Sequence, residues 1–221
     1  DVDARVSDLR SAHAAKTINK IVGLLKQILR YAVESRILPA NSLANYPQLK
    51  VPPSREMYLT AKQVESLLRI TSGTEIFNVI MIAINTGMRP GEICGLCWDR
   101  INFETGFVEV TRTMTRFGLQ ETTKTNRNRQ VPMNQKLELF LRREMLKQVH
   151  PQLICVDRDG QPFNPDHFNE RKFSKVTKAL GLVDFTFHDL RHTYASLFMM
   201  SGGNIFDLQK MLGHTKMDMT Q

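Results

Sequence analysis

The chain has 221 residues, 42% of them hydrophobic and 24% charged, with a net charge of +8 at neutral pH. This length and composition are typical of a globular protein with one core, or a core and a small accessory domain. No apolar run approaches the roughly 20 residues of a membrane-spanning helix, so no membrane partner is expected. Three cysteines, an odd number, argue against a disulfide scaffold and favour the reducing cytoplasm. The basic balance favours nucleic acid as a partner.

The first predicted helix covers residues 17–36, where apolar residues follow a three-four spacing. This stripe consists of Ile18, Ile21, Val22, Leu25, Ile28, Leu29 and Ala32. Segment 1–52 contains eight basic and four acidic residues, so half of the net charge lies on less than a quarter of the length. Lys16 and Lys20 lie largely off the apolar stripe and are predicted to contact DNA. The alternative is an ordinary solvated helix face.

A domain boundary is predicted in a proline-rich stretch. Pro47, Pro52 and Pro53 precede a serine and an arginine, a composition typical of linkers. We therefore divide the chain into a partial helical domain (1–52), a linker (53–57) and a larger domain (58–221). Because the sequence starts without an initiator methionine, we also expect it to be a fragment of a longer protein.

The larger domain begins with three predicted helices. Thr60–Gln63 is a capping box, which starts a helix that ends near Arg69. Glu75–Thr86 is almost entirely apolar, which predicts a helix buried on most sides. Gly87 is expected to end it, and Pro90 to start the next helix, which runs to about Cys97.

A small antiparallel sheet is predicted next. Residues 103–110 have a glycine-containing turn between β-prone flanks, which is typical of a hairpin. Residues 120–123 and 130–133 are two more predicted strands, and the basic segment 124–129 forms a turn between them. Arg127 and Arg129 of that turn are predicted to contact DNA.

The rest of the chain is predicted to be helical, so the fold class is mainly α with a small antiparallel β-sheet (α+β). Capping residues and glycines set the expected bounds of four helices. They are 134–149, 164–181, 186–200 and 204–212, with a turn at 157–160 and Gly213 after the last.

Two arginines and two histidines stand at predicted helix boundaries. Arg89, His188, Arg191 and His214 are distant in sequence, yet helix ends can bring them to one pocket. Guanidinium groups bind phosphate through a planar fork, and imidazoles move protons near neutral pH. Together they suit a phosphodiester whose charge grows in the transition state, without a metal. Taken singly, Arg89 could instead pair with Glu92 at the surface, and His188 could be a helix cap or core partner.

Two other spacings suggest metal or redox chemistry less strongly. His188 and His192 have the spacing of a helical zinc pair, but Asp189 stands where a zinc protease needs glutamate. A zinc hydrolase is therefore the weakest alternative. Cys94 and Cys97 form a C-x-x-C pair without a second pair, and are interpreted as small buried hydrophobes.

In combination these segments resemble the tyrosine recombinase (phage integrase) family. Thr86–Ile93 is similar to its first arginine box, and Thr123–Met133 to its β-hairpin lysine segment. His188–Ser196 matches the H-x-L-R-H box, and Leu212–His214 matches the L-G-H that precedes the nucleophile. Order and spacing agree across residues 58–221. The resemblance implies the catalytic fold of that family, with residues 1–52 as part of its core-binding domain.

The resemblance also implies roles at the scissile phosphate. Arg89 and Arg191 would clamp the phosphate, and His214 would donate a further hydrogen bond. Glu92 would orient the first box. His188 would be the base for the attacking phenol.

The implied reaction needs an acid but no cofactor. Lys124 would protonate the 5′-hydroxyl leaving group, and a 3′-phosphotyrosyl intermediate would preserve the bond energy for rejoining. The implied partner is double-stranded DNA, bound by a homotetramer on paired sites when the protein is full length. As a fragment, the chain is expected to be a monomer. A bacterial, nucleoid-associated protein is implied.

The sequence departs from the family pattern at the nucleophile. The family's tyrosine follows the L-G-H histidine by nine residues, and this chain ends at Gln221, seven after His214. None of its four tyrosines has the required spacing. We therefore expect a fragment that binds DNA without cleaving it. A catalytically inactive DNA-binding regulator with the same fold is the alternative.

Overall fold

The computed structural model describes residues 2–52, 57–121, 128–168 and 172–213. It divides into two compact units, residues 1–55 and residues 56–221. Across the described residues, no helix is both long and apolar enough to cross a membrane. The mainly helical architecture with small antiparallel sheets agrees with the predicted fold class.

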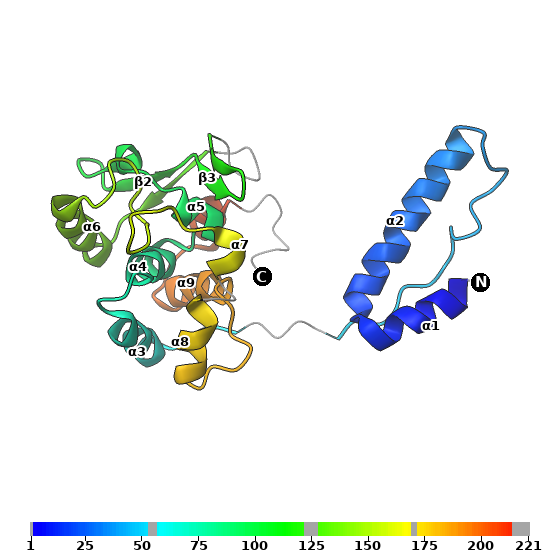
Figure 1. Cartoon of the computed structure of the whole chain (residues 1–221), viewed down its shortest axis with the longest axis horizontal. Helices are drawn as coiled ribbons and strands as arrows, with labels where there is room; N and C mark the ends of the chain where they lie inside the picture. The colour runs from blue at the N-terminus through cyan, green and yellow to red at the C-terminus, as the bar shows by residue number, and fades with distance from the viewer. Residues whose placement is uncertain (1, 53–56, 122–127, 169–171, 214–221) are drawn as a thin grey trace. The chain divides into compact units, whose positions relative to one another are not determined.

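The first unit is a pair of helices, α1 (Val2–Ala12) and α2 (Ala15–Glu34), followed by an extended segment (Figure 1). Helix α2 confirms the predicted helix, shifted by two residues, whereas α1 was not predicted. Val6, Ile18 and Val22 form the small core of this unit. The extended segment returns along α2, where Asn19 exchanges two hydrogen bonds with the backbone of Leu49.

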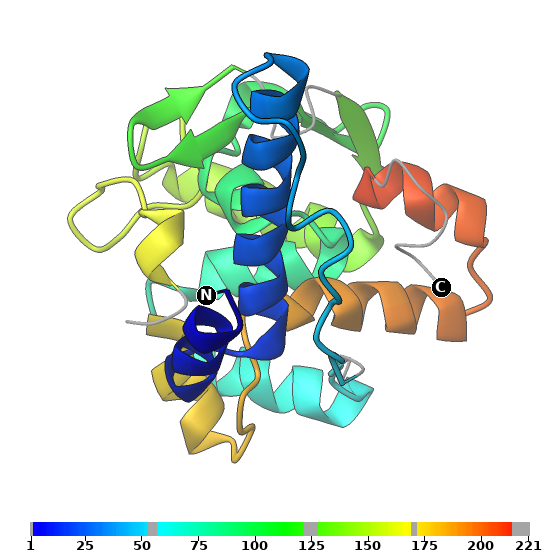
Figure 2. The same ribbon diagram turned by 90° about the vertical axis from the view of Figure 1, so that its right-hand side faces the viewer.

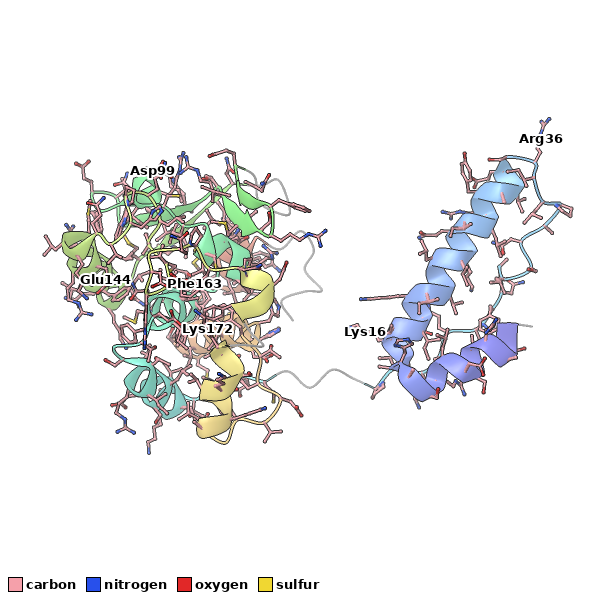
Figure 3. All side chains as sticks on the ribbon, in the orientation of Figure 1. Lys16, Arg36, Asp99, Glu144, Phe163 and Lys172 are labelled. Carbon is pink, nitrogen blue, oxygen red and sulfur yellow. The ribbon has the colours of Figure 1, made fainter. Side chains whose placement is uncertain are left out.

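The apolar stripe predicted for α2 is only partly covered. Ile18 and Val22 are buried, but Leu25 is 42% and Ile28 54% exposed. Lys16 and Lys20 are both exposed, and Lys16 lies at the start of the helix (Figure 3).

The second unit is built around α4 (Phe77–Thr86), which contacts α3, α5, α6 and α9. Eight consecutive residues of α4, from Val79 to Thr86, are buried, which confirms the prediction of a helix enclosed on most sides. Figures 1 and 2 show the helices around it, with α9 and α10 in orange and red. The other helices are α3 (Ala61–Thr71), α5 (Pro90–Cys94), η1 (Trp98–Arg100), α6 (Gln135–Lys147), α7 (Pro165–Phe168), α8 (Ser174–Ala179), α9 (Asp189–Met200) and α10 (Ile205–Leu212).

Local capping chemistry sets several of these helix ends as predicted. The Thr60 side chain accepts a hydrogen bond from the backbone N–H of Gln63, and the Gln63 side chain accepts one from the backbone N–H of Thr60. Asn134 caps α6 and Asn204 caps α10, each with a side-chain oxygen that accepts a backbone N–H of the first helical turn. Such caps satisfy N–H groups that the first helical turn leaves unpaired.

One predicted helix is shorter in the structure, and another is described only in part. The helix that starts at Pro90 ends at Cys94 rather than near Cys97, because Gly95 follows and Cys97 already pairs with Leu153 in an isolated β-bridge. The predicted helix over 164–181 is described as two pieces, α7 and α8, on either side of residues 169–171.

The β-structure forms two sheets rather than the single one predicted. The first has the antiparallel order β1 (Ile101–Asn102), β2 (Phe107–Val110), β5 (Arg129–Pro132), and the β1–β2 pair is the predicted hairpin. The second, β3 (Thr113–Thr115) with β4 (Gly118–Gln120), was not predicted. Because β5 pairs with β2, Arg129 lies in a strand opposite Val110 and not in the basic turn.

Candidate active site

The first predicted arginine stands where α4 ends and α5 begins. Gly87 ends α4 in the left-handed conformation, with φ 62°, and Arg89 is the residue before α5. The backbone N–H of Arg89 donates to Glu92 Oε2 at 2.8 Å, and its Nη1 donates to Oε1 at 3.0 Å. The Arg89 side chain is 24% exposed, so part of it remains open to solvent.

Glu92 is a buried carboxylate, 2% exposed in its side chain, and not a surface partner. Burial by itself would raise its pKa, but hydrogen bonds and charge from Arg129, followed by those of Arg89, hold the pKa below its ordinary value. Glu92 is therefore a fixed negative charge between two arginines. The orienting role that the family resemblance implies for Glu92 stays a prediction.

Arg191 joins three segments that are distant in sequence. Its Nη1 donates to the carbonyl of Gly87 at 2.8 Å, and its Nη2 donates to the carbonyl of Leu212, across separations of 104 and 21 residues. The residue is 5% exposed. Burial and then repulsion from Arg89 lower the pKa of Arg191 to about 9, against an opposing effect of Glu92. The guanidinium therefore remains charged at neutral pH.

His188 immediately precedes α9, three residues before Arg191 and close to His192. The two imidazole rings lie 5.3 Å apart between centroids, at 80° to one another. Partial burial, then the neighbouring His192, Arg191 and Arg89, lower the pKa of His188, and only Asp189 acts in the opposite direction. A lowered pKa keeps the imidazole neutral, which a proton acceptor requires.

Five other predicted site residues fall into two groups. Lys124, Arg127 and His214 lie outside the described residues. Lys16 and Lys20 lie on α2, in the other compact unit. The structure therefore brings together Arg89, Glu92, His188 and Arg191, and places beside them Arg129, which was predicted as a DNA contact.

Arg129 was predicted to lie in a polar basic turn and to contact DNA, but its side chain is only 6% exposed. Its Nη1 donates to Glu92 Oε1 at 3.0 Å, its Nη2 to Glu92 Oε2, and its Nε to the carbonyl of Met211 at 2.6 Å. Strand alternation could have indicated that Arg129 is buried, because Arg129 and the fully buried Val131 lie two residues apart on one face of β5. The backbone carbonyls that Arg129 and Arg191 bind have no sequence signal.

The unpredicted hairpin β3–β4 packs beside the first arginine. Helix α5 contacts β3, and a Cβ on Gly91 would lie 2.6 Å from Thr113 Oγ1, so glycine permits this approach. Between the two elements is a cavity of about 480 Å³, lined among others by Arg89, Glu92 and Phe117.

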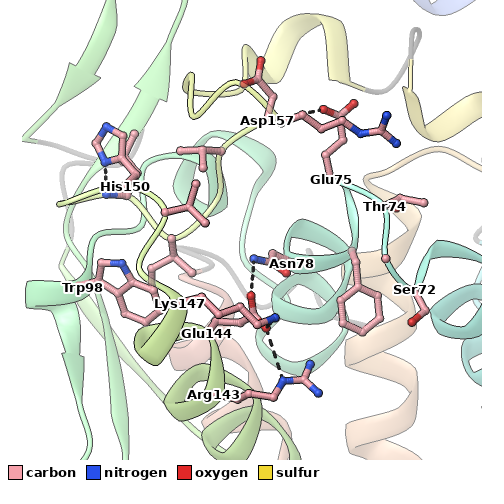
Figure 4. Close-up of a pocket in the computed structure, with 17 residues that line it drawn as sticks. Ser72, Thr74, Glu75, Asn78, Trp98, Arg143, Glu144, Lys147, His150 and Asp157 are labelled. Carbon is pink, nitrogen blue, oxygen red and sulfur yellow. Dashed lines mark hydrogen bonds and ion pairs between the residues drawn. The ribbon is translucent and has the colours of Figure 1, made fainter.

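A larger cavity, about 740 Å³, lies at the other end of α4 (Figure 4). Its charged groups are engaged with one another, since Glu144 binds Asn78, Arg143 and Lys147. We therefore place the candidate site at Arg89 and Arg191, where cationic donors converge, and not in this larger cavity.

Other side chains of the larger unit are candidates for metal, thiol or phenol chemistry. Over the described part of the chain, no three His, Cys, Asp or Glu side chains lie close enough to hold a metal ion. Cys94 and Cys97 are 0% and 2% exposed, as expected for small buried hydrophobes, and burial raises the pKa of Cys94 to about 12. Tyr194 is partly buried, with its hydroxyl on Met211 Sδ, and burial raises its pKa to about 12, which disfavours it as a nucleophile.

Comparison with known proteins places the chain in one family. Residues 57–221 match the model of the phage integrase family. The chain is 26% identical to tyrosine recombinase XerA of Pyrococcus furiosus, over 95% of this chain and 69% of that protein. It is 24% identical to tyrosine recombinase XerC-like of Caldanaerobacter subterraneus, over 94% of this chain and 61% of that protein. The chain thus spans about two thirds of these relatives.

Solved structures share the fold. The Tn1549 transposon integrase in complex with a circular intermediate DNA aligns with a TM-score of 0.83 at 22% identity, covering 96% of this chain and 75% of that one. The lambda integrase tetramer bound to a Holliday junction aligns with a TM-score of 0.77 at 21% identity, over 97% and 63%. The matched family model covers most of the chain, and the chain belongs to the phage integrase family of tyrosine recombinases.

Proposed function

We propose that the whole protein is a site-specific DNA recombinase that cuts and rejoins DNA through a 3′-phosphotyrosyl intermediate. One observation carries the proposal: the Arg191 guanidinium donates hydrogen bonds to the carbonyls of both Gly87 and Leu212. The three segments that resemble family motifs, around Arg89, Arg191 and Gly213, therefore meet at one place. The relatives bear the name tyrosine recombinase, and the Tn1549 integrase with the same fold is seen in complex with DNA.

Arg89 and Arg191 bind the scissile phosphate in this proposal. A guanidinium has five N–H donors, so Arg191 retains three beyond the two that hold the backbone carbonyls. The fixed positive charges stabilise the pentacovalent transition state because they need no reorganisation as negative charge develops. His214, which follows Gly213 in the chain, donates a further hydrogen bond to the same phosphate.

The chemical step is a transesterification. The tyrosine oxygen forms a bond to phosphorus, the bond from phosphorus to the 5′ oxygen breaks, and the phenol proton passes to His188. Lys124 gives a proton to the departing 5′ oxygen. The reverse reaction with a 5′-hydroxyl from another strand rejoins the DNA, so neither ATP nor a redox reagent is consumed.

Residues outside this centre bind the duplex. Residues 1–52 form part of a core-binding domain in which Lys16 and Lys20 contact phosphates, and Arg127 contacts DNA from the segment that carries Lys124. We propose a tetramer on paired DNA sites for the full-length protein, by analogy with the lambda integrase tetramer. Its proposed location is the bacterial cytoplasm, in association with the nucleoid.

The test removes one phosphate ligand in the full-length protein. Arg191→Ala should lower the rate of covalent adduct formation on a nicked DNA site by about 1,000-fold, while DNA affinity changes by less than about tenfold. Arg143→Ala, which removes an exposed arginine of α6, is the control and should leave the rate unchanged. Full activity of Arg191→Ala would contradict the proposed site. A wild-type protein that binds DNA but forms no adduct would instead indicate the regulator.

A further inference from the structure

The carboxylate of Glu92 has all four of its acceptor positions occupied. Oε1 accepts from Nη1 of Arg89 and Nη1 of Arg129, each at 3.0 Å. Oε2 accepts from the backbone N–H of Arg89 and from Nη2 of Arg129. Arg129 therefore supplies half of these bonds, in the two-pronged geometry that only arginine can make.

Arg129 also holds the end of α10. Its Nε donates to the carbonyl of Met211, next to the Leu212 carbonyl that Arg191 holds. The unpaired carbonyls at a helix C-terminus carry partial negative charge, which two buried guanidinium groups satisfy here. A Cβ on Gly213 would lie 3.2 Å from Arg129 Cδ, so the chain leaves α10 directly over the Arg129 side chain.

The charges decide what Arg129 contributes. Glu92 is 2% exposed, so its carboxylate needs a buried counter-charge. If Arg129 were absent, Arg89 would be the remaining charged partner of Glu92. The positive charge of Arg89 would then neutralise Glu92 and would not be available to bind a phosphate. With Arg129 present, the Glu92–Arg129 pair is neutral and Arg89 keeps its charge for a ligand.

We propose that Arg129 is a positioning residue, which neutralises Glu92 so that Arg89 can bind the scissile phosphate and which fixes the α10 end that leads to His214. It does not bind DNA itself. The inference rests on the proposed function, and it assigns Arg129 a different role from the DNA contact predicted from the sequence.

The experiment compares two arginines of the full-length protein that each bind carboxylates. Arg129→Met should lower the cleavage rate at saturating nicked DNA by about 100-fold, as expected when a ligand of the phosphate is misplaced. The dissociation constant for the same DNA should change by less than about tenfold. Arg112→Met is the matched control, because Arg112 is 17% exposed and also binds two carboxylates, Asp99 and Glu121, at the base of the β3–β4 hairpin. Its cleavage rate should stay near that of the wild type.

A second substitution separates positioning from general destabilisation. Glu92→Gln in the Arg129→Met background removes the unpaired charge and should restore the cleavage rate by about tenfold, a coupling expected of residues in one ion-pair network. No recovery would overturn the inference, as would an Arg129→Met rate equal to that of Arg112→Met.

Should Arg129→Met fail to fold, Arg129→Lys decides, because lysine keeps the positive charge but lacks the two-pronged guanidinium. It should lose at least about tenfold in rate, and a wild-type rate would overturn the inference. A wild-type protein that does not cleave DNA would contradict the proposed function itself.

Discussion

The surroundings lower the pKa of both candidate site residues at the start of α9, His188 and Arg191. Burial is the main cause of the lowered pKa of both His188 and Arg191, and Arg89 adds to it in each case. The consequence differs, because the guanidinium stays charged at neutral pH while the imidazole becomes neutral. One cationic cluster thus contains a fixed positive charge beside an imidazole whose neutral form is favoured.

The lowered pKa of His188 predicts the acid limb of the pH profile. A general base works when neutral, so cleavage by the full-length protein should fall as pH drops through a midpoint below 6.5, the ordinary histidine value. Between pH 7 and 8, approximately, the rate should be flat with respect to this group. Single-turnover cleavage measured from pH 5 to 8 tests this, with His188→Gln as the variant that should lose the acid limb. A midpoint above 6.5 would contradict the assignment.

Residue chemistry was enough to predict only part of the site. Arg89, His188, Arg191 and His214 were expected to converge, because their types and the helix ends that carry them suit a phosphate, and the first three of these lie within the described residues. The contacts that fix them were not expected, since the partners of Arg191 are backbone carbonyls, and every residue type has one.

Gly87 shows how closely the elements approach at the site. It ends α4 with φ 62°, and a Cβ there would lie 2.5 Å from Tyr194 Cδ1 of α9 and 2.8 Å from Leu212 Cδ2 of α10. The left-handed conformation alone costs a residue with a side chain about 1–2 kcal/mol. Gly87 therefore both ends the helix and leaves room for α9 and α10.

We predict that Gly87→Ala lowers the free energy of unfolding by about 2–4 kcal/mol, the sum of backbone strain and overpacking. The control is Gly106→Ala, since Gly106 also has positive φ (75°) but nothing within 4 Å of its Cβ position. This control should lose only about 1 kcal/mol. Urea denaturation of both variants measures the difference. Equal losses would show that close packing at Gly87 contributes little.

Helix ends were easier to predict than strand partners. Thr60, Asn134 and Asn204 cap helices through bonds to residues two or three positions away, so the sequence contains the whole interaction. Strand pairing is not local. Segment 129–132 pairs with 107–110, a partner that the sequence did not predict, and packing in the folded unit selects that partner.

At the scale of the whole molecule, the two compact units differ in how much core they contain. The second unit has one large cluster centred on α4, whereas the core of the first consists of Val6, Ile18 and Val22 with a few partly buried neighbours. Residues 1–52 nevertheless carry half of the net charge. The first unit is therefore suited to electrostatic contact with a polyanion more than to independent stability.

This charge distribution predicts a change in salt dependence. Each phosphate contact contributes about −0.9 to the slope of log affinity against log salt concentration for duplex DNA. If Lys16 and Lys20 each contact a phosphate, Lys16→Ala/Lys20→Ala should reduce the magnitude of that slope by about 1.8. Affinity should fall by a similar factor for all DNA sequences, because phosphates carry no sequence information.

The matched control is Lys62→Ala/Lys178→Ala, which removes two exposed lysines from the second unit with the same change in net charge. A general effect of net charge would weaken binding equally in both double variants, whereas direct contacts of α2 with the phosphates would affect only the first. Fluorescence anisotropy of labelled duplex DNA at several salt concentrations distinguishes these outcomes. Equal slopes for the two variants would mean that Lys16 and Lys20 form an ordinary solvated face of α2.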